Sequence, residues 1–245
     1  MLTTKTAVFR CCHYVFLLVG LCSLLASGPL FGESTVLEQD FDDVPEGFEG
    51  RFGEVFGGSD PYGLEGRWSE FGSVAGFPQV KDTSSSRGNV VSMNRVDGEP
   101  SHPLIGNFNP SYPAKRLRLE CDLWVSDEES VAVSISNQNT SVAGILLRSD
   151  AVGICIWNPR DQSWVKTYDS MPVDEWFRLV IDCDVGSASY VVTIVGENGK
   201  ELFEAEGLLV PDYIEDEGVN AILFNPQPGY EKEIKVDDVS VTVGY

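Results

Sequence analysis

Basic residues are scarce in this sequence. It holds 17 lysines and arginines against 38 aspartates and glutamates, for a formal net charge of -21. A surface this acidic repels phosphate backbones and anionic headgroups, so the sequence predicts no nucleic-acid partner and no membrane-surface partner. The same acidity suits an exported protein that stays soluble in salt or collects divalent cations. Solubility alone would account for it equally well.

Histidine and cysteine are also scarce. The sequence has 2 histidines, and only His102 lies beyond the N-terminal apolar segment. The composition therefore argues against a histidine-based active site. Beyond that segment the cysteines are Cys121, Cys155 and Cys183, an odd set that cannot form a closed disulfide framework. Each lies among apolar neighbours in an expected strand, which predicts buried free thiols. One bridge between neighbouring strands is the alternative.

A long apolar run occurs only near the N-terminus. Residues 14–25 follow Lys5 and Arg10, and the run is shorter than the about 20 residues that a spanning helix needs. Residues 1–32 therefore predict a secretory signal peptide, cleaved near Gly32, and a secreted, periplasmic or cell-surface protein without membrane contact after cleavage. An uncleaved anchor is the alternative, and Leu21 argues against a lipid on Cys22. Residues 33–245 are then expected to form a single domain.

Helical periodicity is missing as well, apart from one turn expected at residues 211–216. Between residues 176 and 183, apolar and mixed positions alternate as in a half-buried antiparallel strand. A turn at Gly186, a β-branched run at residues 190–195 and the hairpin signal Asn198-Gly199 follow. Together these features predict a three-stranded meander.

Short strand patterns recur along most of the remaining chain. A short strand opens the mature chain at residue 36, and others are expected near residues 89–93, 115–125, 130–135, 142–148, 153–157, 163–168, 176–184, 189–195, 200–205, 219–224 and 233–243. Residues 48–86 and 95–113 are instead rich in turn residues. The spacing of turn signals, about 8–12 residues, is typical of a sandwich. The sequence therefore predicts an all-β fold of two packed antiparallel sheets of the jelly-roll kind.

The meander also carries a family resemblance. Its pattern of Trp176, Leu179 and Ile181, followed by Tyr190 and the Asn-Gly-Lys turn, resembles the centre of concanavalin-like (laminin-G-like) β-sandwich domains. Such domains include those attached to secreted carbohydrate-active proteins. The resemblance implies a concanavalin-like sandwich and a glycan or polysaccharide partner.

Acidic residues near both chain ends suggest a metal site. Asp40 and Asp42 near the start, with Asp237 and Asp238 near the end, resemble the first and last strands of carbohydrate-binding jelly rolls, which pair and often hold a structural Ca²⁺. Carboxylate oxygens are the ligands that this hard cation prefers. Strand alternation predicts that Asp237 and Asp238 point to opposite faces. Ordinary turn and edge-strand carboxylates are the alternative.

A catalytic carboxylate pair is the second candidate site. Glycoside hydrolases with this fold carry Glu-x-Asp-x-x-Glu on one strand, which brings a nucleophile and an acid together. Glu120 and Asp122 begin that pattern, but Val125 stands where the acid belongs. The sequence therefore predicts no catalytic site, with Glu120 and Asp122 as the residues to test if the protein is an enzyme.

A sugar-binding surface is the third candidate. Sugar rings stack on aromatic side chains, and their hydroxyls pair with amide and carboxylate groups. An expected hairpin tip offers these groups in Trp157, Asn158, Asp161, Gln162 and Trp164. Trp124 and Trp176 are expected in the core instead.

Together these features predict an exported, non-catalytic β-sandwich that binds carbohydrate or a cell surface and holds a structural calcium ion. A polysaccharide-acting enzyme of the same fold is one alternative, either a glycoside hydrolase or a lyase, or similar to keto-disaccharide hydrolases. A structural envelope protein without a ligand is another.

Overall fold

The computed structural model describes residues 33–47, 68, 77–83, 86–94, 102–108, 114–127, 129–137, 140–149, 153–168, 170–210, 212, 219–227 and 233–244. The chain divides into two units, Met1–Glu33 and Ser34–Tyr245, and the fold described below is that of the second. The predicted signal peptide, residues 1–32, lies outside the described residues. Among the residues that are described, no helix has the length and apolar character to cross a membrane.

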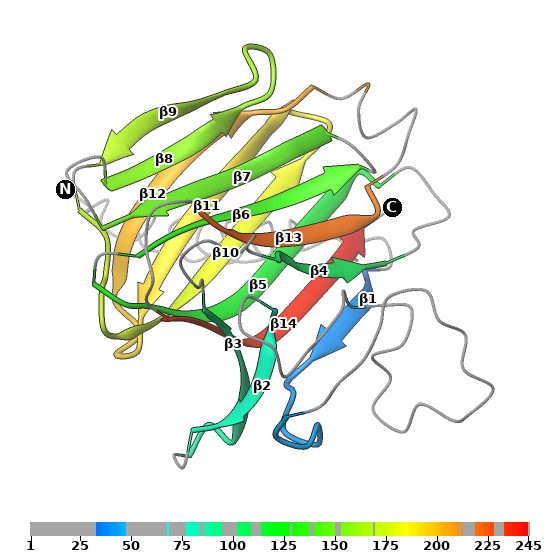
Figure 1. The fold of residues 1–245 in the computed structure, drawn as a ribbon. Helices are drawn as coiled ribbons and strands as arrows, with labels where there is room; N and C mark the ends of the chain where they lie inside the picture. Colours follow the sequence, from blue (N-terminus) through cyan, green and yellow to red (C-terminus); the bar gives the residue numbers. More distant parts are fainter. Residues whose placement is uncertain are drawn as a thin grey trace, which may run out of the picture. The chain divides into compact units, whose positions relative to one another are not determined.

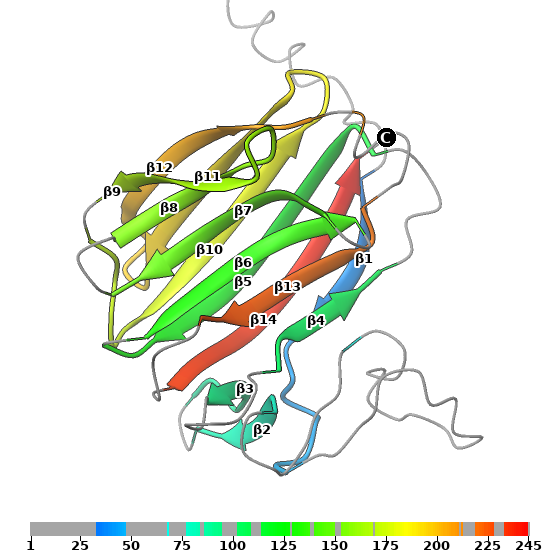
Figure 2. The ribbon, with the colours of Figure 1, turned by 45° about the horizontal axis from the view of Figure 1, so that its top comes forward.

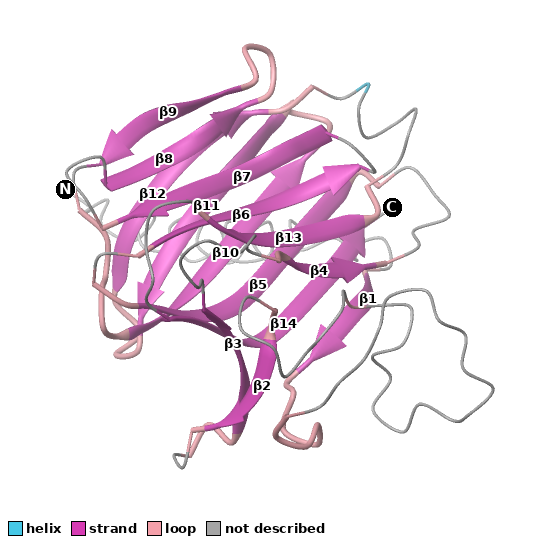
Figure 3. Cartoon of the chain, viewed as in Figure 1, coloured by secondary structure: helices cyan, strands magenta, loops and turns pink. Residues whose placement is uncertain are grey.

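The second unit is built from two antiparallel sheets (Figures 1, 2 and 3). The eight-stranded sheet has the order β12-β11-β10-β5-β14-β3-β2, with β1 also paired to β14. Its strands are β1 (Ser34–Gln39), β2 (Gln79–Asp82), β3 (Asn89–Asn94), β5 (Arg116–Val125), β10 (Trp176–Asp184), β11 (Ser189–Gly196), β12 (Glu201–Leu208) and β14 (Glu233–Gly244). The six-stranded sheet has the order β4-β13-β6-β7-β8-β9. Its strands are β4 (Leu104–Asn107), β6 (Ser130–Asn137), β7 (Thr140–Arg148), β8 (Gly153–Asn158), β9 (Ser163–Tyr168) and β13 (Ala221–Pro226).

The hydrophobic core lies between the two sheets. Alternate residues of β5 and β10 enter it, among them Leu119 and Leu179, and those of β6 and β7 meet them from the other sheet. The period of two in these strands leaves the intervening side chains on the outside. This arrangement confirms the predicted two-sheet antiparallel sandwich.

Tyr190 of β11 connects the two sheets by hydrogen bonding. Its hydroxyl lies 2.6 Å from the carbonyl oxygen of Trp157 on β8 and 3.2 Å from that of Gly144 on β7. Burial raises the pKa of this hydroxyl well above its usual range. Gly207 on the neighbouring β12 makes room for the ring, because a Cβ there would lie 2.3 Å from ring carbons.

Along one side, the last strand, β14, pairs with two different strands. Its first residues pair with β3 and its later residues with β1, while β5 lies along its other side. The register against β5 shifts between Asp237 and Ser240, and Asp238 has a φ of 47°, as expected of a β-bulge. The predicted pairing of the first and last strands is confirmed, and Figures 1 and 2 show β1 beside β14.

The structure agrees with most of the strands expected from the sequence and differs at two. The meander is β10-β11-β12, joined at Asn198-Gly199, where Gly199 has a φ of 75°. The segments expected to be irregular contain β2 and β4. Most of residues 48–86 and the predicted helical turn, apart from Asp212, lie outside the described residues. Cys121, Cys155 and Cys183 are buried and form no disulfide bond with one another, which confirms the prediction of buried thiols.

Candidate functional site

The outer face of the eight-stranded sheet is strongly polar and forms the candidate site. It carries the alternate residues of β5 and β10 that do not enter the core: Arg116, Arg118, Glu120, Asp122 and Trp124 from β5, and Trp176, Arg178, Val180, Asp182 and Asp184 from β10. In the antiparallel register Asp122 lies opposite Arg178 of β10 and Asp237 of β14. Side chains at such positions are direct neighbours on one face of a sheet.

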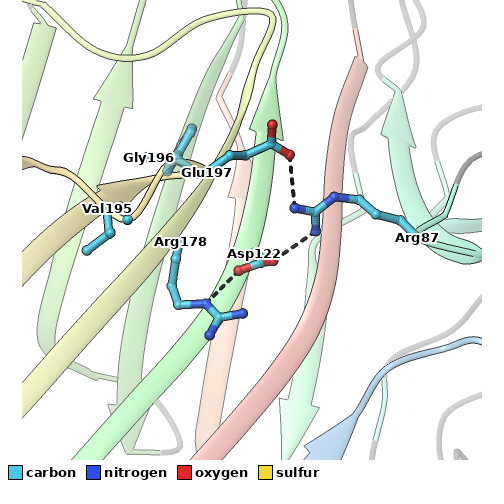
Figure 4. Close-up of a pocket in the computed structure, with 8 residues that line it drawn as sticks. Arg87, Asp122, Arg178, Val195, Gly196 and Glu197 are labelled. Atoms are coloured by element: carbon cyan, nitrogen blue, oxygen red, sulfur yellow. Dashed lines mark hydrogen bonds and ion pairs between the residues drawn. The ribbon is translucent and has the colours of Figure 1, made fainter.

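Asp122 is held between two arginines at the centre of this face (Figure 4). Arg178 Nε and Arg87 Nη1 each donate to one of its carboxylate oxygens at 2.8 Å. Burial alone would raise the pKa of Asp122, but the hydrogen bonds from Arg178 and Arg87 outweigh it and lower the pKa. Asp122 is therefore a fixed, ionised acceptor that positions both guanidinium groups.

Arg87 reaches this face from the turn before β3. Its Nη2 also donates to Glu197 at 3.2 Å, and the Glu197 side chain is 60% exposed. Figure 4 shows the Arg87 guanidinium group joined to Glu197 and to Asp122. An ion pair to so exposed a carboxylate contributes little to stability. Glu197 can therefore leave Arg87 at small cost.

Two tryptophans lie next to Asp122 on the same face. Trp124 and Trp176 are partners across β5 and β10, and both are half-buried. Arg87 lies 4.3 Å from the centre of the Trp176 ring, and Lys235 Nζ lies 4.4 Å from that of Trp124. The expectation that both tryptophans are core residues is wrong, because Trp124 has the same strand parity as Asp122 and Trp176 the same as Arg178.

The pKa of Asp237, which lies opposite Asp122, is shifted in the other direction. Asp237 is only 3% exposed, and burial raises its pKa to about 7, helped by the nearby charges of Asp238 and Asp42. Arg87 lies 3.8 Å from it, too far for a good hydrogen bond. Its carboxylate accepts the Asp238 amide at 2.9 Å.

Asp238 lies on the same outer face as Asp237. Arg178 is 3.9 Å from its carboxylate, and burial raises its pKa. The prediction that Asp237 and Asp238 point to opposite faces is therefore wrong. The reason is the bulge, which inserts a residue and interrupts the alternation of β14.

Three hollows open on this face. The central hollow, about 560 Å³, is lined by Arg87, Asp122, Arg178 and Glu197. The acidic hollow, about 380 Å³, extends over β1, β14, β5 and β10 and is lined by Gln39, Asp40, Glu120, Arg178 and Asp238, among others. The distal hollow, about 520 Å³, is lined by Arg116, Arg118, Asp182, Asp184 and residues of β11. Such volumes are in the range of sites for small ligands.

No protein-family model matches the chain, and neither does any curated protein sequence. Many solved structures match the chain in fold. A carbohydrate esterase from a Shiga toxin-encoding bacteriophage matches with a TM-score of 0.54 at 16% identity, over 87% of this chain and 100% of that one. The CBM2 module of an evolved Dit protein from Lactobacillus casei phage J-1 matches with a TM-score of 0.54 at 11% identity, over 88% and 98%.

A sialidase matches with a TM-score of 0.53 at 10% identity over 84% of this chain, which spans only 18% of the sialidase. The fold is a concanavalin-like β-sandwich. At identities this low the likeness concerns the fold alone.

The four aspartates predicted to bind calcium do not form a ligand set in the described part of this sandwich. Asp40 accepts the Asp42 amide at 3.2 Å, and Asp42 accepts the Asn89 amide at 3.2 Å. Within the described ranges, no group of three or more Asp, Glu, His or Cys side chains is arranged to hold a metal ion. Arg87 and Arg178 lie near Asp237 and Asp238 instead. Calcium stays a prediction from the sequence.

The two carboxylates named as catalytic alternatives are both engaged in ion pairs. Glu120 accepts a hydrogen bond from Arg118, and Asp122 is shared by Arg87 and Arg178. They lie on the same face of β5, as their spacing predicted. The lowered pKa of Asp122 makes it unsuited to donating a proton at neutral pH.

The residues predicted to bind sugar lie elsewhere in the sandwich, on the hairpin of β8 and β9. Trp157 and Trp164 are cross-strand partners with ring centres 5.1 Å apart, and both are half-buried. Asn158 donates to Asp161 at 2.8 Å and accepts that residue's amide, while Gln162 has a φ of 47°. The predicted hairpin is confirmed, and its polar side chains close the turn.

Proposed function

We propose that the protein binds a glycan on the outer face of the eight-stranded sheet. The observation that carries this proposal is the cross-strand pair Trp124 and Trp176 directly beside the Asp122–Arg178 ion pair. The apolar face of a sugar ring stacks on indole, and its hydroxyls pair with charged donors and acceptors. This face offers both kinds of group within neighbouring residue pairs.

The rigidity of this face supports binding. Trp124 and Trp176 stand on central strands, and Asp122 holds the guanidinium groups of Arg87 and Arg178. Groups that are fixed before the ligand arrives lose little conformational entropy on binding. Two structures of similar fold, a carbohydrate esterase and a sialidase, agree with a sugar ligand by analogy.

The hairpin of β8 and β9 is the competing glycan surface. Trp157 and Trp164 offer part of their rings, but Asn158 and Asp161 already bond within the turn. The three hollows described above lie on the outer face of the eight-stranded sheet, beside Trp124 and Trp176 and not lined by them. The outer face of the eight-stranded sheet is therefore our first choice.

A hydrolytic enzyme is the second candidate function, and one observation favours it. Asp122 and Asp237 are opposite one another, and their surroundings lower the pKa of the first and raise that of the second to about 7. Paired carboxylates with separated pKa values are how acid and base roles are divided. Two features favour plain binding instead: Asp237 is almost wholly buried, and two arginines hold Asp122.

We further propose that the protein acts outside the cytoplasm. The support is the apolar segment at residues 14–25 and the strong acidity of the chain, with a net charge of -21. A structural envelope protein without a ligand is the remaining alternative, and it predicts no glycan binding at all.

The test is to incubate the purified protein with a panel of soluble and insoluble polysaccharides. Retention on a polysaccharide and release of new reducing or unsaturated ends are both scored. Retention without new ends is the expected result. New ends that disappear in Asp237→Asn would establish the enzyme instead, and neither retention nor release would leave the structural alternative.

A further inference from the structure

The three hollows on the outer face adjoin one another. Arg178 lines both the central and the acidic hollow, and Val195 lines both the central and the distal hollow. The central hollow therefore has each of the other two as a neighbour. We call the three adjoining hollows together the groove.

The groove is long compared with a single sugar. From Arg178 to Asp184 it follows β10 for six residues, which is about 20 Å at the rise of a strand. In the other direction it crosses β10, β5 and β14 to reach β1, three strand spacings or roughly 14 Å. A single ring would fill only one of its three parts.

The groove is a shallow surface feature, and its walls are half-exposed side chains. Arg178 is 48% exposed, and Glu197 is 60% exposed. Its floor is formed by residues of adjacent strands. Because its walls are open to solvent, a polymer can lie on it without burying a chain end.

The charges of the groove select against anions. In the central hollow Arg87 and Arg178 balance Asp122 and Glu197. In the distal hollow two arginines likewise balance Asp182 and Asp184. The acidic hollow adds four carboxylates against Arg178 alone. The groove has no net positive charge, so an acidic sugar gains nothing at two hollows and is repelled at the third.

An uncharged sugar matches the same groups well. Each hydroxyl both donates and accepts a hydrogen bond, and guanidinium donors lie beside carboxylate acceptors on β5 and β10. Hydrogen bonds to charged partners are the stronger kind. Both kinds of group occur in each of the three hollows.

We propose that the ligand is an internal stretch of an uncharged polysaccharide chain that occupies all three hollows together. This inference rests on the proposed glycan-binding function and names its ligand class. It assigns Arg116 and Gln39, near opposite ends of the groove, as contacts for the outer sugar units.

The test is calorimetric binding of the purified protein to oligosaccharides of increasing length. The probes are uncharged gluco-, xylo- and manno-oligosaccharides from the disaccharide to the hexasaccharide, with oligogalacturonides of the same lengths as acidic counterparts. For the series that binds, we expect the hexasaccharide to bind at least tenfold more tightly than the disaccharide. The oligogalacturonides should bind at least tenfold more weakly than the uncharged chain of equal length.

Substitutions near the two ends of the groove locate the outer contacts. Arg116→Gln and Gln39→Ala should each weaken hexasaccharide binding several-fold and leave disaccharide binding unchanged. Lys166→Gln, on the exposed β9 of the other sheet, is the matched control and should change neither. Circular dichroism of each variant verifies that it is folded.

The outcomes separate this inference from the proposed function. Equal affinity for disaccharide and hexasaccharide would overturn the extended groove and leave glycan binding intact. Equal or tighter binding of oligogalacturonides would overturn the charge argument. No binding of any oligosaccharide, with the panel of polysaccharides also negative, would overturn the proposed function and this inference together.

Discussion

Asp122 and Asp237 are partners across β5 and β14, yet their surroundings move their pKa values in opposite directions. Two short hydrogen bonds from arginines keep Asp122 ionised, whereas burial with only a distant guanidinium raises the pKa of Asp237 to about 7. The arginines account for the difference, because both reach Asp122 at 2.8 Å whereas Arg87 lies 3.8 Å from Asp237. Both residues therefore give the stability of the fold a distinct pH dependence.

Asp237→Asn should stabilise the protein at alkaline pH and have little effect near pH 4. An unfolded aspartate loses its proton near pH 4, and Asp237 in the folded protein does so near pH 7. Between these values the folded state binds more protons, so the contribution of Asp237 falls as the pH rises and is smallest above pH 7. The gain from asparagine should then reach a few kcal/mol, at about 1.4 kcal/mol per pKa unit. Urea denaturation across the pH range measures it, and a gain independent of pH would contradict the assignment.

Asp122→Asn should destabilise the protein by about 2 kcal/mol at neutral pH, because Arg87 and Arg178 lose their shared charge. The folded pKa of Asp122 is lowered, so its contribution is complete above the unfolded pKa near 4 and is lost as the pH falls through the folded value. Denaturation of both proteins at several pH values tests this. The matched control is Glu197→Gln, which removes an exposed carboxylate from Arg87 and should cost under about 0.5 kcal/mol. A larger effect of Glu197→Gln than of Asp122→Asn would contradict the assignment.

Trp176→Ala should weaken glycan retention about fivefold or more, because stacking of a ligand ring on an aromatic side chain is worth about 1–3 kcal/mol. Trp164→Ala removes an equally half-buried tryptophan from the other sheet and is the matched control. Affinity electrophoresis in the polysaccharide that retains the protein measures both. If only Trp164→Ala lowers retention, the site lies on the hairpin of β8 and β9.

Calcium should raise the melting temperature, and a chelator should reverse the rise. The carboxylates of Asp42, Asp237 and Asp238 are close enough to raise the pKa of Asp237 by their charges, and a divalent cation would offset that repulsion. Each kcal/mol of binding energy corresponds to about 2–4 °C for a domain of this size. Asp238→Asn should abolish the response. A melting temperature that neither calcium nor the chelator changes would contradict the predicted calcium site.

The thiols of Cys121, Cys155 and Cys183 should react with a thiol reagent only after unfolding. All three are buried and form no disulfide bond with one another, and burial raises the pKa values of Cys121 and Cys183, which suppresses the reactive thiolate. Reaction with a chromogenic disulfide in native buffer and in denaturant measures the accessible thiols. Rapid reaction of the native protein would contradict this burial.

The regular strands could be predicted because their side chains alternate. β10 and β11 follow the expected ranges closely, since Leu179, Ile181 and Val192 mark the core face without ambiguity. β2 and β4 were missed because each has four residues and follows a proline, so neither is long enough to show a period. Their strand conformation depends on pairing with distant partners.

The candidate site could be predicted only in part. Parity along β10 was a usable signal, because Trp176 shares it with Arg178 and so belongs outside the core. The position of Arg87 beside Asp122 has no local signal, since the two are 35 residues apart and meet only through the turn before β3. The bulge in β14, which places Asp237 and Asp238 on the same face, lies where β14 changes its neighbouring strand and likewise has no signal in the sequence.

The central place of β14 has a consequence for how the chain folds. Strands β5, β10, β11 and β12 are contiguous in the sheet, but β1 and β3 reach them only through β14. Before β14 has been synthesised, β1 and β3 cannot join the other strands of the eight-stranded sheet. Ser34 of β1, for example, cannot pair with Val243 until then. Pairings of such long sequence separation fold slowly. A ribosome-bound chain that lacks β14 would therefore expose the edge of β5, where a second chain could add its own strand.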